Sequence, residues 1–106
     1  TDPDNINVDT NINPFSFALH QSFPNPFNPS TEIRYEIPDD LLVSVSVYDM
    51  AGRLIRSLIN EAKPAGSYSV VWDGKNDYGA NVATGVYIYS IEAGKHRKNK
   101  KAVFLK

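Results

Sequence analysis

Apolar and polar residues alternate along several short stretches of this chain, which is the pattern of strands that bury one face. Over residues 31–37, Ile33, Tyr35 and Ile37 fall on one face and polar or charged residues on the other. The same alternation recurs further along, and a shorter apolar stretch precedes it. The sequence therefore predicts strands over 16–22, 31–37, 43–49, 67–73, 86–93 and 100–106.

Residues 53–63 fit a helix as well as a strand, because their apolar positions satisfy both spacings. The residues just before them favour one answer. Asp49 and Gly52 occupy the first and fourth positions of a type I turn, and Gly52 supplies the positive φ that a G1 bulge requires. Such a turn returns the chain antiparallel, so we favour a strand over 53–63.

These strands, separated by regular turn signals and without a clear helix, predict an all-β fold. We expect an immunoglobulin-like antiparallel β-sandwich of about seven strands. Its core would rest on Trp72, the tyrosines and the valines, including Val103, since the chain has no cysteine pair. Tyr87 stands near the start of a strand after a long loop, which is the place of the tyrosine corner in such sandwiches.

Residues 1–15 are polar, rich in Asn and Asp, and show no period. We therefore expect a linker or loosely attached arm over 1–15 and a single domain over 16–106. The chain opens with Thr1, and we interpret it as a piece of a larger protein. No stretch approaches the ~20 apolar residues of a membrane-spanning helix, so we expect no membrane insertion.

The composition argues against several classes of chemistry. The absence of cysteine excludes disulfides and thiol chemistry. The net charge of −1 gives no general attraction to nucleic acid. His20 and His96 stand outside any catalytic motif, and the acidic residues are scattered rather than paired. We expect a protein that is not an enzyme and does not bind nucleic acid.

Two oxygen-rich stretches leave a cation site open, because calcium prefers carboxylate and amide oxygens. They consist of Asp2, Asp4, Asn5, Asn7 and Asp9, and of Asp73, Asn76, Asp77 and Asn81. Neither matches an EF-hand loop, and Asn and Asp are also the usual turn formers. We expect no cofactor, with calcium as the alternative.

The run KHRKNKK over 95–101 holds five basic residues. Lysines on a strand at the edge of a sheet block edge-to-edge pairing, and this is the interpretation we favour. A protein partner remains an alternative, as does binding of nucleic acid or acidic glycan. The run contains no aromatic platform for bases, which weakens the nucleic-acid alternative.

Three prolines, at positions 24, 26 and 29, stiffen the segment ahead of the strand at 31–37. Each fixes its own φ and removes a backbone donor, so we expect a non-helical crossover between two strands. The alternative is a recognition loop that exposes Asn25, Phe27 and Asn28.

Several motifs then occur in a fixed order: PNPFNPST, VYDMAGR, PAGSYSVVWDG, GVYIYSIEAG and a terminal KKAVFLK. Over residues 19–106 this order resembles the C-terminal sorting domain of proteins exported by the type IX secretion system. The stretch VVWDGKNDYGANVATGVYIYS also resembles the Ig-like domain of flagellar hook-capping proteins (FlgD), a related fold. The loop 74–84 is longer than in many sorting domains and is closer to the hook-cap type.

The resemblance implies a non-catalytic domain at the end of a secreted or cell-surface protein, beside catalytic or adhesive domains. The outer-membrane secretion machinery would recognise it, and a sortase-like protease would then remove it or leave it on the surface. The family motifs fall on Pro24, Asn25, Pro26, Asp49, Gly52, Arg53, Gly85, Tyr87, Lys101, Val103 and Lys106. The alternatives are a structural Ig-like spacer or hook-cap-like module, and a carbohydrate-binding appendage that would use outward aromatics such as Tyr48 and Tyr78.

Overall fold

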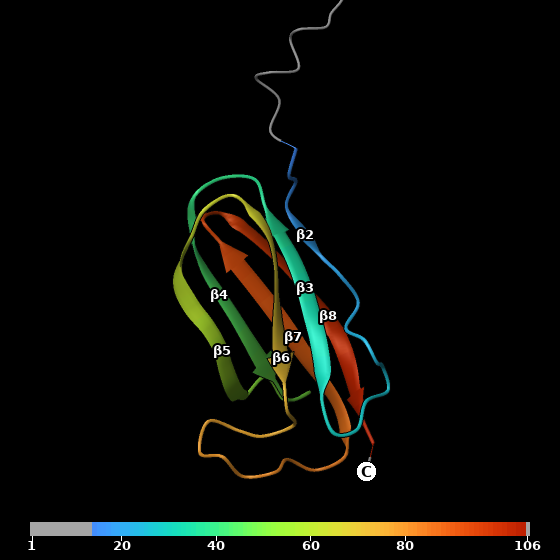
Figure 1. The fold of residues 1–106 in the computed structure, drawn as a ribbon. Helices are drawn as coiled ribbons and strands as arrows, with labels where there is room; N and C mark the ends of the chain where they lie inside the picture. Colours follow the sequence, from blue (N-terminus) through green and yellow to red (C-terminus); the bar gives the residue numbers. More distant parts are fainter. Residues whose placement is uncertain (1–13, 106) are drawn as a thin grey trace, which may run out of the picture.

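The computed structural model describes residues 14–105, which form seven strands in two antiparallel sheets (Figure 1). The three-stranded sheet has the order β2-β3-β6, and the four-stranded sheet has the order β5-β4-β7-β8. The strands are β2 (Ala18–Leu19), β3 (Thr31–Ile37), β4 (Leu41–Tyr48), β5 (Leu54–Lys63), β6 (Gly66–Trp72), β7 (Gly85–Ala93) and β8 (His96–Phe104). The sandwich predicted from the alternating pattern is confirmed, and residues 54–63 form a strand as expected.

The core lies between the two sheets, where the inward-facing side chains of their strands pack against each other. The alternation over 31–37 and 43–47 places its apolar members inside as predicted, and Trp72 is only 1% exposed. The buried apolar residues are Leu19, Phe27, Ile33, Tyr35, Ile37, Val43, Val45, Val47, Trp72, Val82, Tyr87, Tyr89, Ile91, Ala93, Ala102 and Phe104.

Two sequence-based expectations about burial were wrong. Val103 does not fill the core, because on β8 the inward positions are Ala102 and Phe104, and Val103 lies half-buried on the outer face. Phe27 is not an exposed member of a recognition loop, because its side chain is 1% exposed. Phe27 lies in an isolated bridge outside any strand, and the end of β8 has apolar residues on both faces, so the alternation alone does not say which side chains meet the core.

Tyr87 forms the expected tyrosine corner. Its hydroxyl donates a hydrogen bond to the Ala83 carbonyl oxygen, at 2.6 Å and four residues upstream. Tyr68 makes the same contact with the Pro64 carbonyl, also at 2.6 Å. Each tyrosine follows a glycine by two residues at the start of its strand. The starts of β6 and β7 are therefore held by the same kind of hydrogen bond, from a tyrosine hydroxyl to a backbone carbonyl.

Tyr35 has a fully buried hydroxyl without a hydrogen-bond partner, and burial raises the pKa of this residue to about 12. Tyr89 is equally buried, yet its hydroxyl accepts from Ser22 N–H and donates to His20 O, each at 2.8 Å. An unpaired buried hydroxyl destabilises a fold, whereas a paired one supports it.

We predict opposite effects for the two matched substitutions. Tyr35→Phe should raise the free energy of unfolding by about 1 kcal/mol, because it removes an unpaired polar group. Tyr89→Phe should lower it by about 1–3 kcal/mol, because the buried Ser22 N–H and the partly buried His20 carbonyl lose their partner. Urea unfolding followed by Trp72 fluorescence measures both, and equal losses for the two variants would contradict the prediction.

Candidate functional site

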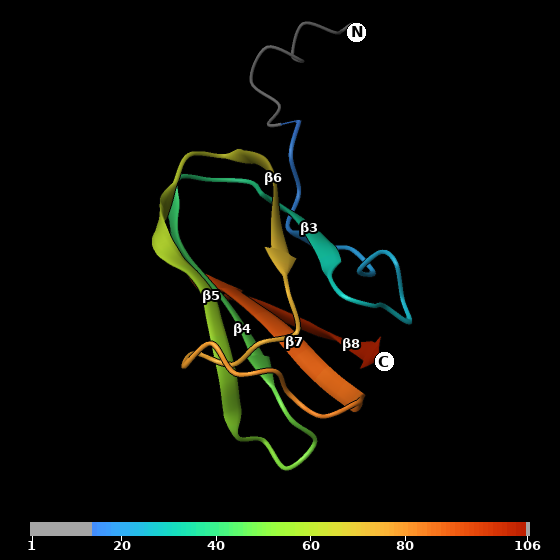
Figure 2. The ribbon, with the colours of Figure 1, turned by 60° about the horizontal axis from the view of Figure 1, so that its bottom comes forward.

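The residues singled out by their motifs gather at one end of the sandwich (Figures 1 and 2). In the four-stranded sheet, Tyr48 of β4 pairs with Ile88 of β7, which pairs with Lys101 of β8. The turn that follows Tyr48, the start of β7 and the end of β8 therefore lie together. Figure 2 shows this end from below, with the proline segment between β2 and β3 curling beside the tip of β8.

The proline segment is bonded directly to the last strand. Asn25 Oδ1 accepts a hydrogen bond from Val103 N–H at 2.8 Å, although the two residues lie 78 positions apart in the chain. Phe27 N–H donates to Val103 O at 2.8 Å, and Leu105 N–H donates to Phe27 O at 3.0 Å. The segment thus leaves its own sheet, adds a parallel bridge to β8 of the other sheet, and returns to β3.

Four aromatic rings fix this junction from the inside. The Phe27 ring stacks on Phe104 with centroids 4.9 Å apart, and it lies 5.2 Å from the Trp72 ring. Trp72 meets Tyr87 edge-on at 5.2 Å. A Cβ at position 74 would lie 3.1 Å from the Phe104 ring, so Gly74 allows the loop after β6 to close over the cluster. The proline segment and the end of β8 are consequently one packed unit.

Asp49 organises the turn between β4 and β5 as the sequence predicted. Its Oδ1 accepts from the backbone N–H groups of Ala51 and Arg53 at 2.9 Å, and its Oδ2 accepts from Arg53 Nε at 2.9 Å. Gly52 has a φ of 86°, which favours glycine. The pKa of the Asp49 carboxyl is lowered, chiefly by the hydrogen bond from Arg53 N–H.

We predict that Asp49→Asn removes a pH-dependent part of the stability. The lowered pKa means that the ionised carboxylate contributes stability above its ordinary pKa of 3.8, and that this contribution disappears as acid protonates it. The variant keeps an acceptor oxygen but no charge. Its melting temperature should therefore lie below that of the wild type at neutral pH, and the two should converge as the pH falls below the lowered pKa of Asp49. If the difference in melting temperature between the wild type and Asp49→Asn stayed the same at every pH, the stabilising role of the Asp49 charge would be contradicted.

The motif residues differ in what a partner could touch. Those with exposed side chains or backbone are Pro24, Asn25, Pro26, Gly52, Arg53 and Lys101. Asp49, Gly85 and Val103 are half-buried, and Tyr87 is buried. Lys106 lies outside the described residues. We call the exposed group of six the end surface.

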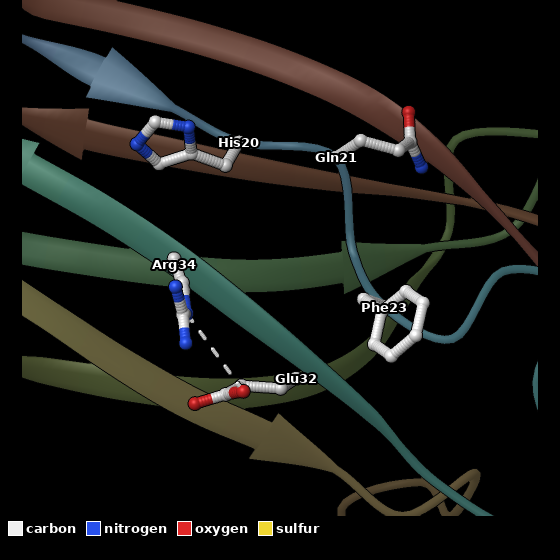
Figure 3. A pocket seen from close by; sticks show the side chains of 5 residues that line it. All are labelled: His20, Gln21, Phe23, Glu32 and Arg34. Carbon is white, nitrogen blue, oxygen red and sulfur yellow. Dashed lines mark ion pairs between the residues drawn. The ribbon is translucent and has the colours of Figure 1, made fainter.

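A shallow pocket of about 340 Å³ adjoins the proline segment on the outer face of the three-stranded sheet (Figure 3). Phe23 lines it and is 78% exposed, and the other lining residues are His20, Gln21, Glu32 and Arg34. Glu32 and Arg34 form an ion pair at 3.8 Å. Sequence reasoning missed Phe23, although an aromatic residue directly before the first proline was a usable signal.

A second hollow of about 290 Å³ lies on the outer face of the four-stranded sheet, beside the Asp49 turn. Met50 lines it and is 56% exposed, and Tyr48 and Ile88 form its apolar wall. The alternating pattern placed Tyr48 outward correctly. Tyr78, which is 94% exposed, belongs to the loop after β6, so the two outward tyrosines come from different elements.

The oxygen-rich loop after β6 directs its acidic groups toward Arg56. Arg56 Nη1 lies 3.2 Å from Asp73 Oδ1, and Arg56 Nε lies 3.9 Å from Asp77 Oδ1. Asn76 Oδ1 accepts from two backbone N–H groups of the same loop. Within residues 14–105 no three His, Asp or Glu side chains are grouped to hold a metal ion. The other oxygen-rich stretch, over residues 2–9, lies outside the described part.

Residues 96–101 of the basic run belong to β8, an edge strand, as the sequence suggested. His96 at its start stacks on Phe17 with centroids 4.8 Å apart, and Lys98 Nζ lies 5.6 Å from the same ring. His20 lies 3.5 Å from Glu36. These contacts give both histidines structural neighbours.

No helix in the described range 14–105 is long and apolar enough to cross a membrane. Comparison with family models gives a match to the FlgD Ig-like domain over residues 29–97, about two thirds of the chain. A search of curated proteins finds no match.

Several solved structures are similar to this chain, among them one of PorU and one of FlgD. The first is dimeric latent PorU from Porphyromonas gingivalis, with a TM-score of 0.67 and 25% identity over 90% of this chain. The second is FlgD from P. aeruginosa, with a TM-score of 0.56 and 25% identity over 70% of this chain. The chain spans 10% of the PorU chain and 57% of the FlgD chain.

Proposed function

This chain belongs to the FlgD Ig-like domain family, and on that premise we propose that it is a non-catalytic secretion and sorting domain of a larger secreted or cell-surface protein. The type IX export machinery of the outer membrane would recognise its end surface. A sortase-like protease is a further partner. The order of the five sequence motifs supports this proposal, and so does the similarity to a tenth of PorU.

One observation carries the proposal: the segment 24–26 and the last strand form a single bonded unit at the end of the sandwich that also holds the Asp49 turn, with β7 between them. Motifs that are far apart in the sequence thereby present one surface. Arg53 and Lys101 supply its positive charges, and the proline rings supply a rigid apolar part. Because aromatic packing fixes the unit from inside, a partner could bind it without ordering a flexible tail.

Charge reversal on the end surface tests the proposal. In the parent protein, Arg53→Glu combined with Lys101→Glu should reduce secretion at least about tenfold and leave the protein in the periplasm. Both side chains are exposed and the variant loses one surface ion pair, between Arg53 and Asp49, so the melting temperature of the domain should fall only slightly. Normal secretion of this double variant would refute recognition through this surface.

The matched control is Arg97→Glu combined with Lys95→Glu. Arg97 is exposed and pairs with the acidic Glu92, as Arg53 does with Asp49, and Lys95 is exposed at the opposite end of the sandwich. Secretion of the control should equal that of the wild type. Equal losses for both pairs would point to an effect of net charge and would also count against the end surface.

A structural module, such as a spacer or hook-cap-like domain, is the second candidate. It is favoured by the family match, which ends at Arg97 and so omits the part of β8 in the end surface. The apolar wall formed by Tyr48, Met50 and Ile88 would suit contact with a neighbouring domain. This candidate predicts that removing the whole domain leaves export of the parent protein unchanged.

A further inference from the structure

The two sheets have four edge strands, β2, β6, β5 and β8, and each edge can accept a further strand unless something blocks it. β2 is only two residues long. β8 carries the basic run, and Gln21 Nε2 donates to Lys101 O while Asn25 and Phe27 bond to Val103. The shortness of β2 protects the first edge. The positive charge of β8 and its hydrogen bonds to Gln21, Asn25 and Phe27 protect the second.

β5 is also blocked. Its pairing with β4 contains two register shifts, which distort the strand. The loop after β6 binds its free side, since Asp77 N–H donates to Ile55 O at 3.0 Å and Ser57 N–H donates to Asp77 Oδ1 at 2.9 Å. An incoming strand would have to displace this loop.

β6 has no such protection. Its sequence GSYSVVW contains no charge and no proline, and its register with β3 is unbroken over seven pairs. The direction in which its backbone N–H and C=O groups point can be inferred from the hydrogen bonds of β3. The backbone of Glu32 bonds to that of Phe23, and Arg34 O accepts from His20 N–H. The backbone N–H and C=O groups of these two β3 residues therefore point away from β6.

Because backbone direction alternates along a strand, the β6 residues paired with Glu32 and Arg34 also turn away from β3. The N–H and C=O groups of Ser67, Ser69 and Val71 thus point out from the edge. Within residues 14–105 no hydrogen bond satisfies them. The side chains of all three are exposed, and Val71 is 56% exposed. The edge of β6 therefore offers three N–H and three C=O groups to a further strand.

We propose that β6 pairs with β6 of a second copy of this chain, antiparallel about a two-fold axis at Ser69. This register sets Ser69 against itself, Ser67 against Val71 and Tyr68 against Val70. The three N–H groups of each copy then donate to the three C=O groups of the other. The two three-stranded sheets become one continuous sheet of six strands.

Self-pairing fits β6 because every opposed pair is neutral. Tyr68 and Val70 form aromatic–aliphatic pairs, which stabilise adjacent strands. The charged residues beside β6 are Glu32, Arg34 and Glu36 of β3, which lie on the side away from the incoming strand, and Glu32 and Arg34 pair with each other at 3.8 Å. The same operation on β8 would set lysine and arginine side chains against each other.

Sedimentation velocity over a concentration series tests the proposal, with Ser69→Pro as the variant. Proline on an outward N–H leaves the β3 ladder intact, but it removes the donor at the two-fold axis and blocks approach of the second strand. The wild type should dimerise, and the dissociation constant of the variant should rise about 100-fold or more. Circular dichroism verifies that the variant is folded.

Ser69→Thr is the matched control, because it keeps the N–H and favours a strand; it should dimerise like the wild type. Hydrogen exchange gives a second readout: the amides of Ser67, Ser69 and Val71 should become protected as concentration rises. A wild type that stays monomeric, or a dimer that Ser69→Pro does not weaken, overturns the proposal. Protection of these amides only in the presence of a different protein overturns it as well.

Discussion

Replacing Trp72 with alanine should lower the free energy of unfolding by about 3–5 kcal/mol, which is as large a loss as single core truncations usually produce. The side chain is 1% exposed and contacts the rings of Phe27, Phe104 and Tyr87. Its Nε1 also donates to Lys75 O at 2.9 Å. The substitution therefore opens a cavity and leaves the loop after β6 without one of its anchors.

Chemical denaturation followed by far-UV circular dichroism measures this loss. Val71→Ala is the control, because Val71 is the neighbouring residue on the same strand but is 56% exposed. It should cost well under about 1 kcal/mol. A Trp72→Ala variant as stable as this control would show that the aromatic cluster is not the centre of the fold.

Deleting residues 102–106 should abolish the cooperative fold altogether. Ala102 and Phe104 are buried, and Phe104 supplies the ring on which Phe27 stacks. The deletion also removes the backbone groups of Val103 that hold Asn25 and Phe27. With half of the junction gone, the proline segment loses its hydrogen-bond partners on β8.

Calorimetry of the truncated chain should show no unfolding transition, whereas Lys101→Ala, an exposed change at the same strand, should melt close to the wild type. A normal transition in the truncated chain would contradict the packing described above. The expected unfolding also means that failure to export the truncated protein would not separate lost recognition from lost folding. The charge-reversal variants avoid this ambiguity.

Much of the fold was predictable because its signals are local. The alternation over 31–37 and 43–47 specified strands and their buried faces, and Asp49 and Gly52 specified the turn that makes 54–63 a strand. The tyrosine corner at Tyr87 followed from its place after a long loop. These features depend on neighbours within a few residues, so a single sequence contains them.

The candidate site was predictable only in part. Motif resemblance selected its residues one by one, and it treated Pro24–Asn25–Pro26 and Val103 as separate elements. Their bond depends on β8 lying at the sheet edge next to the proline segment. Phe27 was misplaced because it lies in an isolated bridge without an alternating pattern, and Val103 was misplaced because apolar residues occupy both faces at the end of β8.

The sequence by itself determined that this chain is a β-sandwich, which residues of its longer strands face inward, and where its turns fall. Period-two alternation and turn chemistry act through the local backbone. Only the tertiary structure decided the order of strands in each sheet. That order places the proline segment where it can bond to β8, and it leaves β6 at an unpaired edge. Strand order arises from contacts between segments far apart in the chain, and the local pattern of each segment is compatible with several neighbours.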